Sequence, residues 1–399
     1  MQSALSFCSI ILSRLQKEEK EELMEQQKPS VSLLLGAGFS APMGYPLAKE
    51  LNNKIITFYK EYNAISSNGE LCFVGDYNPT FDNYMPLFSF CKTFIQRYKS
   101  EVGDDFDYEV FYDVMVNEYK THAYEHLYTD IKNYHKYVSD MEMVFNQIIE
   151  AFIRDGNKTT WYEKTPPDKT LYGKYKSFID IVQLWSRDKI INVHTLNHDL
   201  LFEAFNNDYL SGMISDGFSI EQSPYYGKSE NESICLERYI EKYDTPIHLY
   251  KLHGSIDYVI YFDLKNNFLP KDYIKIKQNV RIDDLLEKQA DGSFEHFVFA
   301  NNSDILSGEK TKMKRYKEPL FYSKVINFFQ QNLQTADKII IIGYSGGDAG
   351  INRMIVETKG LNNKKVFLVD PYPNVDFANS INATIIKKSI ECITFKDLE

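Results

Sequence analysis

Short apolar runs that end in polar or glycine-containing segments recur along the chain and predict buried strands. They are too short for helices, and they lack the alternation expected of a strand with one face in water. The clearest runs are residues 31–35, 189–195, 247–252, 338–343 and 365–370. Stretches with helical spacing lie between them, such as residues 47–56 and 351–358. Strands of this kind alternating with helices predict an α/β fold, with a parallel sheet covered by helices on both faces.

Between the first two runs the pattern changes. Residues 58–176 contain no convincing buried strand, and stretches such as 141–153 show helical periodicity. We therefore expect a large helical insertion there, within an α/β domain formed by residues 30–57 and 177–399. Residues 1–29 begin apolar and end highly charged, without a cleavage site. We expect a helix there that packs on its own domain or on a neighbouring subunit of a homo-oligomer.

Composition narrows the class of protein. The chain has 43% hydrophobic and 25% charged residues, which is typical of a soluble globular protein. A net charge of −11 argues against direct nucleic-acid binding, which normally needs a basic surface. The five cysteines are far apart and form no C-x-x-C pair, so neither a zinc site nor a disulfide framework is indicated. Free thiols and the lack of a membrane-length apolar stretch predict a cytoplasmic protein without a membrane contact.

The first strand ends in a glycine turn with a recognisable spacing. Gly36, Gly38 and Ala41 fit the G-x-G-x-x-G/A form of the dinucleotide fingerprint, in which the glycines make a turn and let a pyrophosphate approach. A bare glycine turn is the alternative. The acid that usually binds the ribose about twenty residues later is missing. Asp370, at the end of a late strand, is our candidate for that contact with the adenosine ribose.

Polar clusters follow almost every predicted strand. They are Gly36–Ser40, Thr195–Asp199, His253–Ser255, Gly343–Ser345 and Asp370. Each has a structural alternative: Asn197 or Asp199 could cap a helix, His253 could be a buried core histidine, and Asp370 could shape a turn before proline. Residues 346–348 could likewise be a turn and a cap. The carboxyl ends of parallel strands share one edge of a sheet, where ligands of open α/β sheets bind. Five such clusters on one edge are more easily explained by one ligand-binding site than by five independent turns or caps.

In order and spacing these clusters resemble the motifs of the sirtuin superfamily. Gly36-Ala-Gly-Phe-Ser40 with Gly44 and Pro46 is similar to the GAGxS…GxP opening, and Thr195-Leu-Asn-His-Asp199 to TQNxD. Leu252-His-Gly-Ser255 is similar to LHGS, and Gly343-Tyr-Ser345 to GTS. The resemblance implies a Rossmann-like domain that binds NAD in an inverted orientation and cleaves the bond between nicotinamide and ribose.

The resemblance also implies roles for single residues. Asn197 would lie near the nicotinamide ribose and a water, Asp199 would contact the carboxamide, and His253 would be the general base. The chemistry agrees, because a neutral histidine accepts protons near pH 6.5 and an amide can orient water without competing for them. The residues implied to hold NAD are Gly36, Ala37, Gly38, Ser40, Pro46, Thr195, Gly343 and Ser345.

Two departures bear on the activity. Leu47-Ala-Lys follows Pro46 where deacylases of the family have Asp-Phe-Arg, and four clustered cysteines for their zinc module are absent. The chain therefore looks more like the bacterial sirtuin-like NADases of antiphage defence, one group of which assembles with a HerA-type ATPase. This implies an NAD+ glycohydrolase with NAD as substrate, no metal, and a partner ATPase. The alternatives are a non-catalytic subunit that binds NAD or ADP-ribose, and a protein deacylase or ADP-ribosyl transferase.

Overall fold

The computed structural model describes most of the chain. The described residues are 28–65, 71–74, 85–128, 131–153, 169–229, 232–263, 269–277, 280, 285–296 and 303–399. The predicted N-terminal helix falls almost entirely on residues 1–27 and lies outside the described residues.

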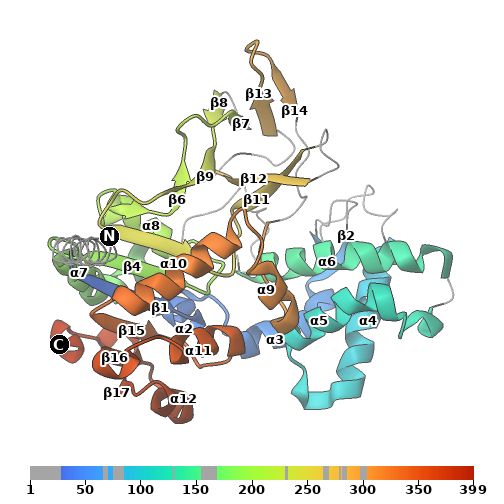
Figure 1. Ribbon diagram of the computed structural model, residues 1–399. Helices are drawn as coiled ribbons and strands as arrows, with labels where there is room; N and C mark the ends of the chain where they lie inside the picture. The colour runs from blue at the N-terminus through green and yellow to red at the C-terminus, as the bar shows by residue number, and fades with distance from the viewer. Residues whose placement is uncertain are drawn as a thin grey trace, which may run out of the picture.

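A seven-stranded sheet, parallel throughout, forms the centre of the molecule (Figure 1). Its strands are β1 (Ser30–Leu35), β4 (Ile190–Thr195), β5 (Ile214–Ser215), β10 (Ile247–Lys251), β15 (Lys338–Ile342), β16 (Lys365–Val369) and β17 (Thr384–Ile386). The order across the sheet is β17-β16-β15-β1-β4-β10-β5. Leaving out the two-residue edge strand β5, this is the doubly wound Rossmann order, with the chain switching direction between β1 and β15.

Both faces of the sheet are buried, because side chains of successive strand residues point to opposite faces. In β15, Ile340 and Ile342 join one apolar cluster with helices α7 and α8, while Ile339 and Ile341 join another with α10 and α11. The covering helices are α7 (Lys176–Trp185), α8 (Leu201–Asp208), α10 (Tyr322–Thr335), α11 (Ala349–Val356) and α12 (Val375–Ser380). The predicted α/β fold with helices on both faces is confirmed.

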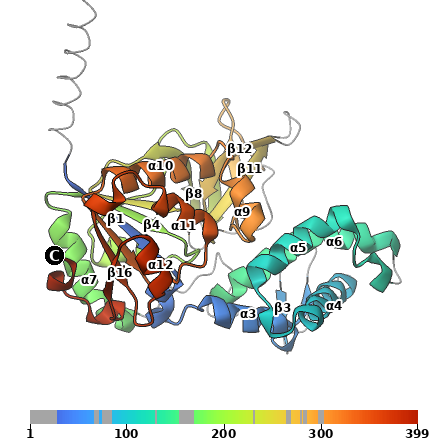
Figure 2. The same cartoon turned by 60° about the horizontal axis from the view of Figure 1, so that its bottom comes forward.

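A group of helices lies beside the sheet, to the right in Figures 1 and 2. It consists of α3 (Ala48–Thr57), α4 (Met85–Val102), α5 (Tyr108–Thr121) and α6 (Ile131–Ile153), which share an apolar core. Within the described residues of 58–176, most of the chain lies in the helices α4, α5 and α6. The division of the chain into an α/β domain and a helical insertion at 58–176 stays a prediction. A small hairpin of β2 (Tyr62–Ile65) and β3 (Leu71–Phe73) was not expected, because strands this short carry little periodicity.

Two antiparallel sheets lie above the central sheet, at the top of Figure 1. Their strands are β6 (Gly217–Ser219), β7 (Tyr225–Ser229), β8 (Glu232–Cys235), β9 (Glu237–Lys242), β11 (Tyr258–Asp263), β12 (Leu269–Lys275), β13 (Leu285–Lys288) and β14 (Phe294–His296). Only β11 could be anticipated from alternating residues. The others are short or rich in charged residues, as in β14, where all three residues are exposed.

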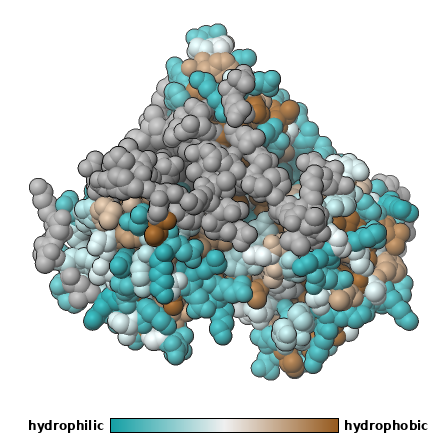
Figure 3. Space-filling model, turned by 180° about the vertical axis from the view of Figure 1, so that it is seen from behind, coloured by the Kyte–Doolittle hydropathy of each residue, from teal (hydrophilic) through white to brown (hydrophobic). Residues whose placement is uncertain are grey.

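Two short helices lie near the sheet edge, α2 (Ala37–Ser40) and α9 (Glu309–Arg315). In Figures 1 and 2, α9 lies between the sheet and the helical group. On the described part of the face in Figure 3, hydrophobic residues form small separate groups among hydrophilic ones. Among the described residues, no helix has the length and apolar character needed to cross a membrane.

Candidate active site

The carboxyl ends of four neighbouring strands bring the predicted motifs together. Across the sheet, β15, β1, β4 and β10 are adjacent. They are followed in turn by Gly343–Ser345, Gly36–Ser40, Thr195–Asp199 and His253–Ser255. This edge includes the switch point between β1 and β15, where open α/β sheets bind ligands.

The two glycine loops at the switch point pack directly on each other. The Gly38 amide donates to the Gly343 carbonyl at 2.9 Å. A Cβ on Gly36 would lie 2.6 Å from the Gly343 oxygen, and one on Gly38 would lie 2.8 Å from the Gly343 Cα. Gly343 itself has a φ of +63°, which glycine adopts without strain. Contact between the loops therefore already requires these glycines, whether or not a phosphate binds there.

A short helix that was not predicted lies between the glycine turn and the predicted helix. The four-residue α2 follows Gly36, and a 3₁₀ turn at Ala41–Met43 separates it from α3. Pro42 lies in this turn, and Gly44 ends it with a φ of +89°. The ten-residue helix expected at residues 47–56 is present as α3, but it does not begin at the glycines. The helix dipole available at the loop is that of a single turn.

Asn197 joins the end of β4 to the glycine loop of β1. Its Nδ2 donates to the Gly36 carbonyl at 3.0 Å and to Ser40 Oγ at 2.9 Å. Its main-chain amide donates to Thr195 Oγ1 at 3.0 Å. Both donor positions of the side chain are thus occupied, and in the part of the chain that the structure describes Oδ1 accepts no hydrogen bond. Oδ1 is the atom available to orient a water or a ribose hydroxyl.

Asp199 has a structural role at the start of α8. Its Oδ1 accepts a hydrogen bond from the Leu201 amide at 3.0 Å, and its carbonyl accepts a hydrogen bond from Lys251 Nζ. Burial raises the pKa of Asp199, while the nearby Lys251 ammonium opposes that rise. Asp199 thus shapes the turn that leads into α8, whose N-cap residue is Leu200, so the capping alternative is not what the structure shows. The predicted contact with a carboxamide stays a prediction.

His253 follows β10 and is held by a tight turn. Its carbonyl accepts the Leu306 amide at 2.8 Å, and the next residue, Gly254, has a φ of +78°. A Cβ on Gly254 would lie 2.1 Å from the Asp304 carbonyl, so the turn needs glycine. The His253 ring is buried, and its Nε2 is 2.9 Å from the Tyr316 hydroxyl. Burial and the Lys312 ammonium lower the pKa of His253, which keeps the ring neutral at neutral pH.

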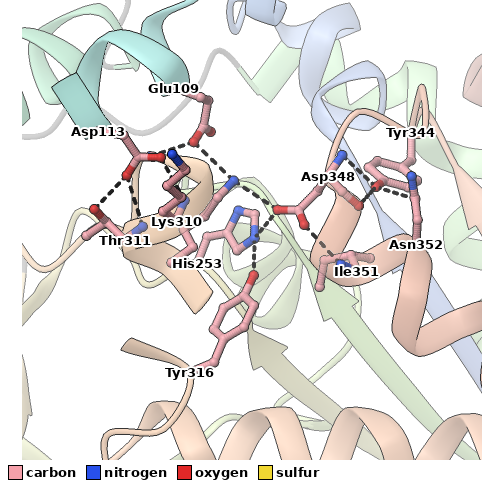
Figure 4. A network of polar contacts seen from close by, with 12 residues as sticks. Glu109, Asp113, His253, Lys310, Thr311, Tyr316, Tyr344, Asp348, Ile351 and Asn352 are labelled. Atoms are coloured by element: carbon pink, nitrogen blue, oxygen red, sulfur yellow. Dashed lines mark hydrogen bonds and ion pairs between the residues drawn. The ribbon is translucent and has the colours of Figure 1, made fainter. Parts of the chain in front are cut away.

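Four residues that the sequence did not indicate as site residues, Tyr316, Asp348, Lys312 and Glu109, contact His253 or its neighbours. Tyr316, Asp348 and Glu109 are labelled in Figure 4. Asp348 Oδ2 lies 3.3 Å from His253 Nε2 and 2.9 Å from Lys312 Nζ. Lys312 Nζ lies 3.1 Å from Glu109 Oε2, on helix α5. The sequence predicts for Asp348 only a place in a turn and a cap. Its place just after a strand was the available signal, whereas no pattern pointed to Lys312, Tyr316 or Glu109.

The remaining predicted NAD-binding residues lie at strand ends or in the segment between β1 and α3. Thr195 is buried and Ser345 is exposed, with the Ser345 carbonyl accepting from Asn374 Nδ2 at 3.0 Å. Asp370, at the end of β16, accepts the Tyr372 amide at 2.7 Å, so it shapes the turn at Pro371 as the alternative supposed. Ala37 and Pro46 are half-buried in the segment after β1. No contact tests whether any of these residues binds NAD.

A metal site was not expected. Within the described residues, no group of three or more His, Cys, Asp or Glu side chains is arranged to hold a metal ion.

Comparison with known proteins gives structural matches only. No protein-family model matches the chain, and no curated protein matches its sequence. Similar solved structures include a Sir2 homologue in complex with NAD, with a TM-score of 0.38, 11% identity, and coverage of 93% of this chain and 89% of the other. A mutant Sir2 homologue in complex with ADP-ribose has a TM-score of 0.36, 12% identity, and coverage of 93% and 92%. A structure from a study of sirtuin substrate affinity has a TM-score of 0.35 and 13% identity, and the match covers 94% of each chain. Because these scores are low, we draw nothing about the site from them.

Proposed function

We propose that the protein is an NAD+ glycohydrolase that cleaves NAD to nicotinamide and ADP-ribose. One observation carries the proposal: Asn197, fixed on the glycine loop, and the buried neutral His253 lie on the same sheet edge beside the switch point. They are the polar and basic groups that the reaction needs. The sirtuin-like motifs in which they occur support the same substrate.

The reaction places modest demands on the protein. NAD+ and water give nicotinamide, ADP-ribose and a proton. The leaving nicotinamide is already cationic, so the glycosidic bond breaks without a general acid, and the ribose passes through an oxocarbenium-like state. Asn197 Oδ1 would orient the attacking water or a ribose hydroxyl. His253 would accept the proton from the attacking water or hydroxyl. General-base catalysis of this kind contributes about 10²- to 10⁴-fold to the rate.

The alternatives differ in a measurable product. A non-catalytic subunit would bind NAD or ADP-ribose without turnover, whereas a deacylase or ADP-ribosyl transferase would need an acceptor besides water. The absence from the sequence of a four-cysteine cluster counts against the deacylase. Incubation of the purified protein with NAD, followed by chromatography of nicotinamide and ADP-ribose, separates the three. Binding without product under every condition would favour the regulatory subunit.

We further propose that the activity serves antiphage defence by NAD depletion and is controlled by assembly, with a HerA-type ATPase as partner. The support is the motif resemblance and the lack of a zinc module. The assay above should therefore be run with the protein alone and with a candidate ATPase, and the mass of each assembly measured in solution. Equal rates with and without the ATPase, and no complex, would contradict the partnership but not the NADase activity.

Replacing Asn197 with alanine is expected to lower the rate of nicotinamide release by roughly two orders of magnitude. The change removes both hydrogen bonds to the glycine loop and the free Oδ1. Asn206→Ala is a matched control, because Asn206 also holds a loop, accepting the Ile214 amide at 3.1 Å, but at the far end of α8. Equal rates in the two variants would show that Asn197 has only a structural role.

A further inference from the structure

We propose that Asp348 is the positioning residue of His253, and that Lys312 and Glu109 hold Asp348 in place, so that helix α5 of the insertion forms part of the active site. The inference rests on the proposed function. It concerns residues outside all four sequence motifs, and it stands on the contacts shown in Figure 4.

The two oxygens of Asp348 have different tasks. Oδ1 accepts the Ile351 amide at 2.9 Å, which anchors the carboxylate at the first turn of α11. Oδ2 is buried and accepts no aligned hydrogen bond from the described residues, yet it lies 3.3 Å from His253 Nε2 and 2.9 Å from Lys312 Nζ. Catalytic hydrogen bonds are often long before substrate binds and shorten in the complex. Oδ2 is thus an acceptor held at a fixed position beside the His253 ring.

This arrangement selects one tautomer of His253. An ionised carboxylate only accepts hydrogen bonds, so Asp348 favours the proton on Nε2. The Tyr316 hydroxyl, 2.9 Å from the same nitrogen, both donates and accepts and is compatible with that tautomer. Nδ1 then carries the lone pair, and among the described residues it has no hydrogen-bond partner. Nδ1 is therefore the basic nitrogen that faces the substrate.

The carboxylate is tied to the helical insertion through α9. Lys312 is buried between Asp348 and Glu109, with Nζ–oxygen distances of 2.9 and 3.1 Å. Glu109 also accepts the Gly308 amide at 2.6 Å. Asp113, one turn further along α5, accepts the amides of Lys310 and Thr311 at 2.7 and 3.0 Å. Helix α5 thus holds the start of α9. Lys312 in α9 and Tyr316, the residue directly after α9, lie next to Asp348 and His253.

The charges around His253 act on its pKa in opposite directions. Asp348 and Glu109 raise it, while burial and Lys312 lower it more. His198, from the loop after β4, also faces the ring, with centroids 6.2 Å apart, and its own pKa is lowered by burial. Tyr316 completes the set, and burial raises the pKa of its hydroxyl. The base must be neutral, so the rate rises with pH through the pKa of His253.

Two substitutions should therefore move the pH profile of kcat/KM in opposite directions. Asp348→Asn keeps an oxygen for the Ile351 amide but turns a donor toward Nε2, which favours the wrong tautomer. We expect a loss of at least about 100-fold in kcat with little change in KM, and the rising limb moved to lower pH. Lys312→Met should move the rising limb to higher pH by about one unit. Glu109→Gln should move the rising limb to lower pH, as Asp348→Asn does, but by less.

Matched controls come from the distant C-terminus and α10. Like Asp348, Asp397 accepts a main-chain amide and pairs with a lysine. Its Oδ2 accepts the Thr394 amide at 2.8 Å, and its Oδ1 lies 2.8 Å from Lys388 Nζ. Lys324 forms an ion pair with Glu241 at 2.6 Å. Asp397→Asn and Lys324→Met should leave the profile unchanged. If Asp348 and Lys312 have only a structural role, their substitutions would lower stability without moving the pH profile of kcat/KM in opposite directions. Unshifted profiles in both variants would overturn the proposal.

A second measurement separates this proposal from the proposed function. The ¹⁵N chemical shifts of the His253 ring in the free protein report its tautomer without any substrate. We expect Nε2–H in the unmodified protein and Nδ1–H in Asp348→Asn. The same tautomer in both would overturn the positioning role even if NAD is cleaved. The expected tautomers in a protein that never cleaves NAD would sustain the positioning of His253 and refute only the glycohydrolase.

Discussion

The variant His253→Ala is expected to release nicotinamide about 10²- to 10⁴-fold more slowly than the unmodified protein. His253 is the buried imidazole on the sheet edge, with a pKa lowered by burial and by Lys312, so it is a neutral base under assay conditions. Its removal leaves Asn197 and the glycine loops in place. NAD binding, measured by calorimetry, should persist while turnover falls.

His253→Gln sharpens the result, because glutamine keeps a polar side chain that cannot accept a proton at neutral pH. The matched control is His248→Ala. His248 lies on the same strand, β10, but toward its other end, where its Nδ1 is 3.4 Å from the Tyr250 hydroxyl. We expect near-normal turnover in that control. Normal turnover in His253→Gln would show that the base has been assigned to the wrong residue.

The central sheet could be predicted from the sequence because its strands are buried on both faces. Residues 338–342 of β15 are apolar without a break after the first position, and that pattern is independent of the rest of the chain. The small antiparallel strands and the β2–β3 hairpin could not be predicted in the same way. These strands are short and contain both polar and apolar residues. Their structure depends on pairing with strands distant in the sequence rather than on a local pattern.

The candidate site was predictable as far as it follows the strands. Asn197 and His253 stand directly after β4 and β10, so the topology alone brings them to one edge. Lys312 and Glu109 are 203 positions apart in the chain and meet only because α9 packs on α5. A lysine in a basic helix and a glutamate at a helix start carry no sign of that contact.

The glycines illustrate a motif for which the structure adds a second physical reason to the expected one. The sequence suggested that Gly38 lets a pyrophosphate approach. In the structure, a side chain there would already collide with the backbone of Gly343. Both requirements produce the same sequence pattern, so the pattern alone cannot separate them.

Gly343→Ala is accordingly expected to be one of the most damaging single changes at this edge. An alanine Cβ would lie 2.3 Å from the Phe39 amide nitrogen and 2.4 Å from the Gly38 carbonyl carbon, so the two loops must separate. Left-handed backbone costs alanine about 1 to 2 kcal/mol, and forced repacking adds about 1 to 3 kcal/mol. The shift would also displace Gly36, whose carbonyl accepts from Asn197. Both the thermal midpoint and the affinity for NAD should fall.

Gly360→Ala isolates the backbone term. Gly360 has a similar φ of +73°, but a Cβ there would meet nothing within 4 Å. It precedes the 3₁₀ turn Leu361–Asn363, away from the strand ends. This control should lower the thermal midpoint less and leave NAD binding intact. If the two variants are equally stable and bind NAD equally well, contact between the glycine loops does not support Asn197, and the glycines at 36 and 38 must be explained by the ligand instead.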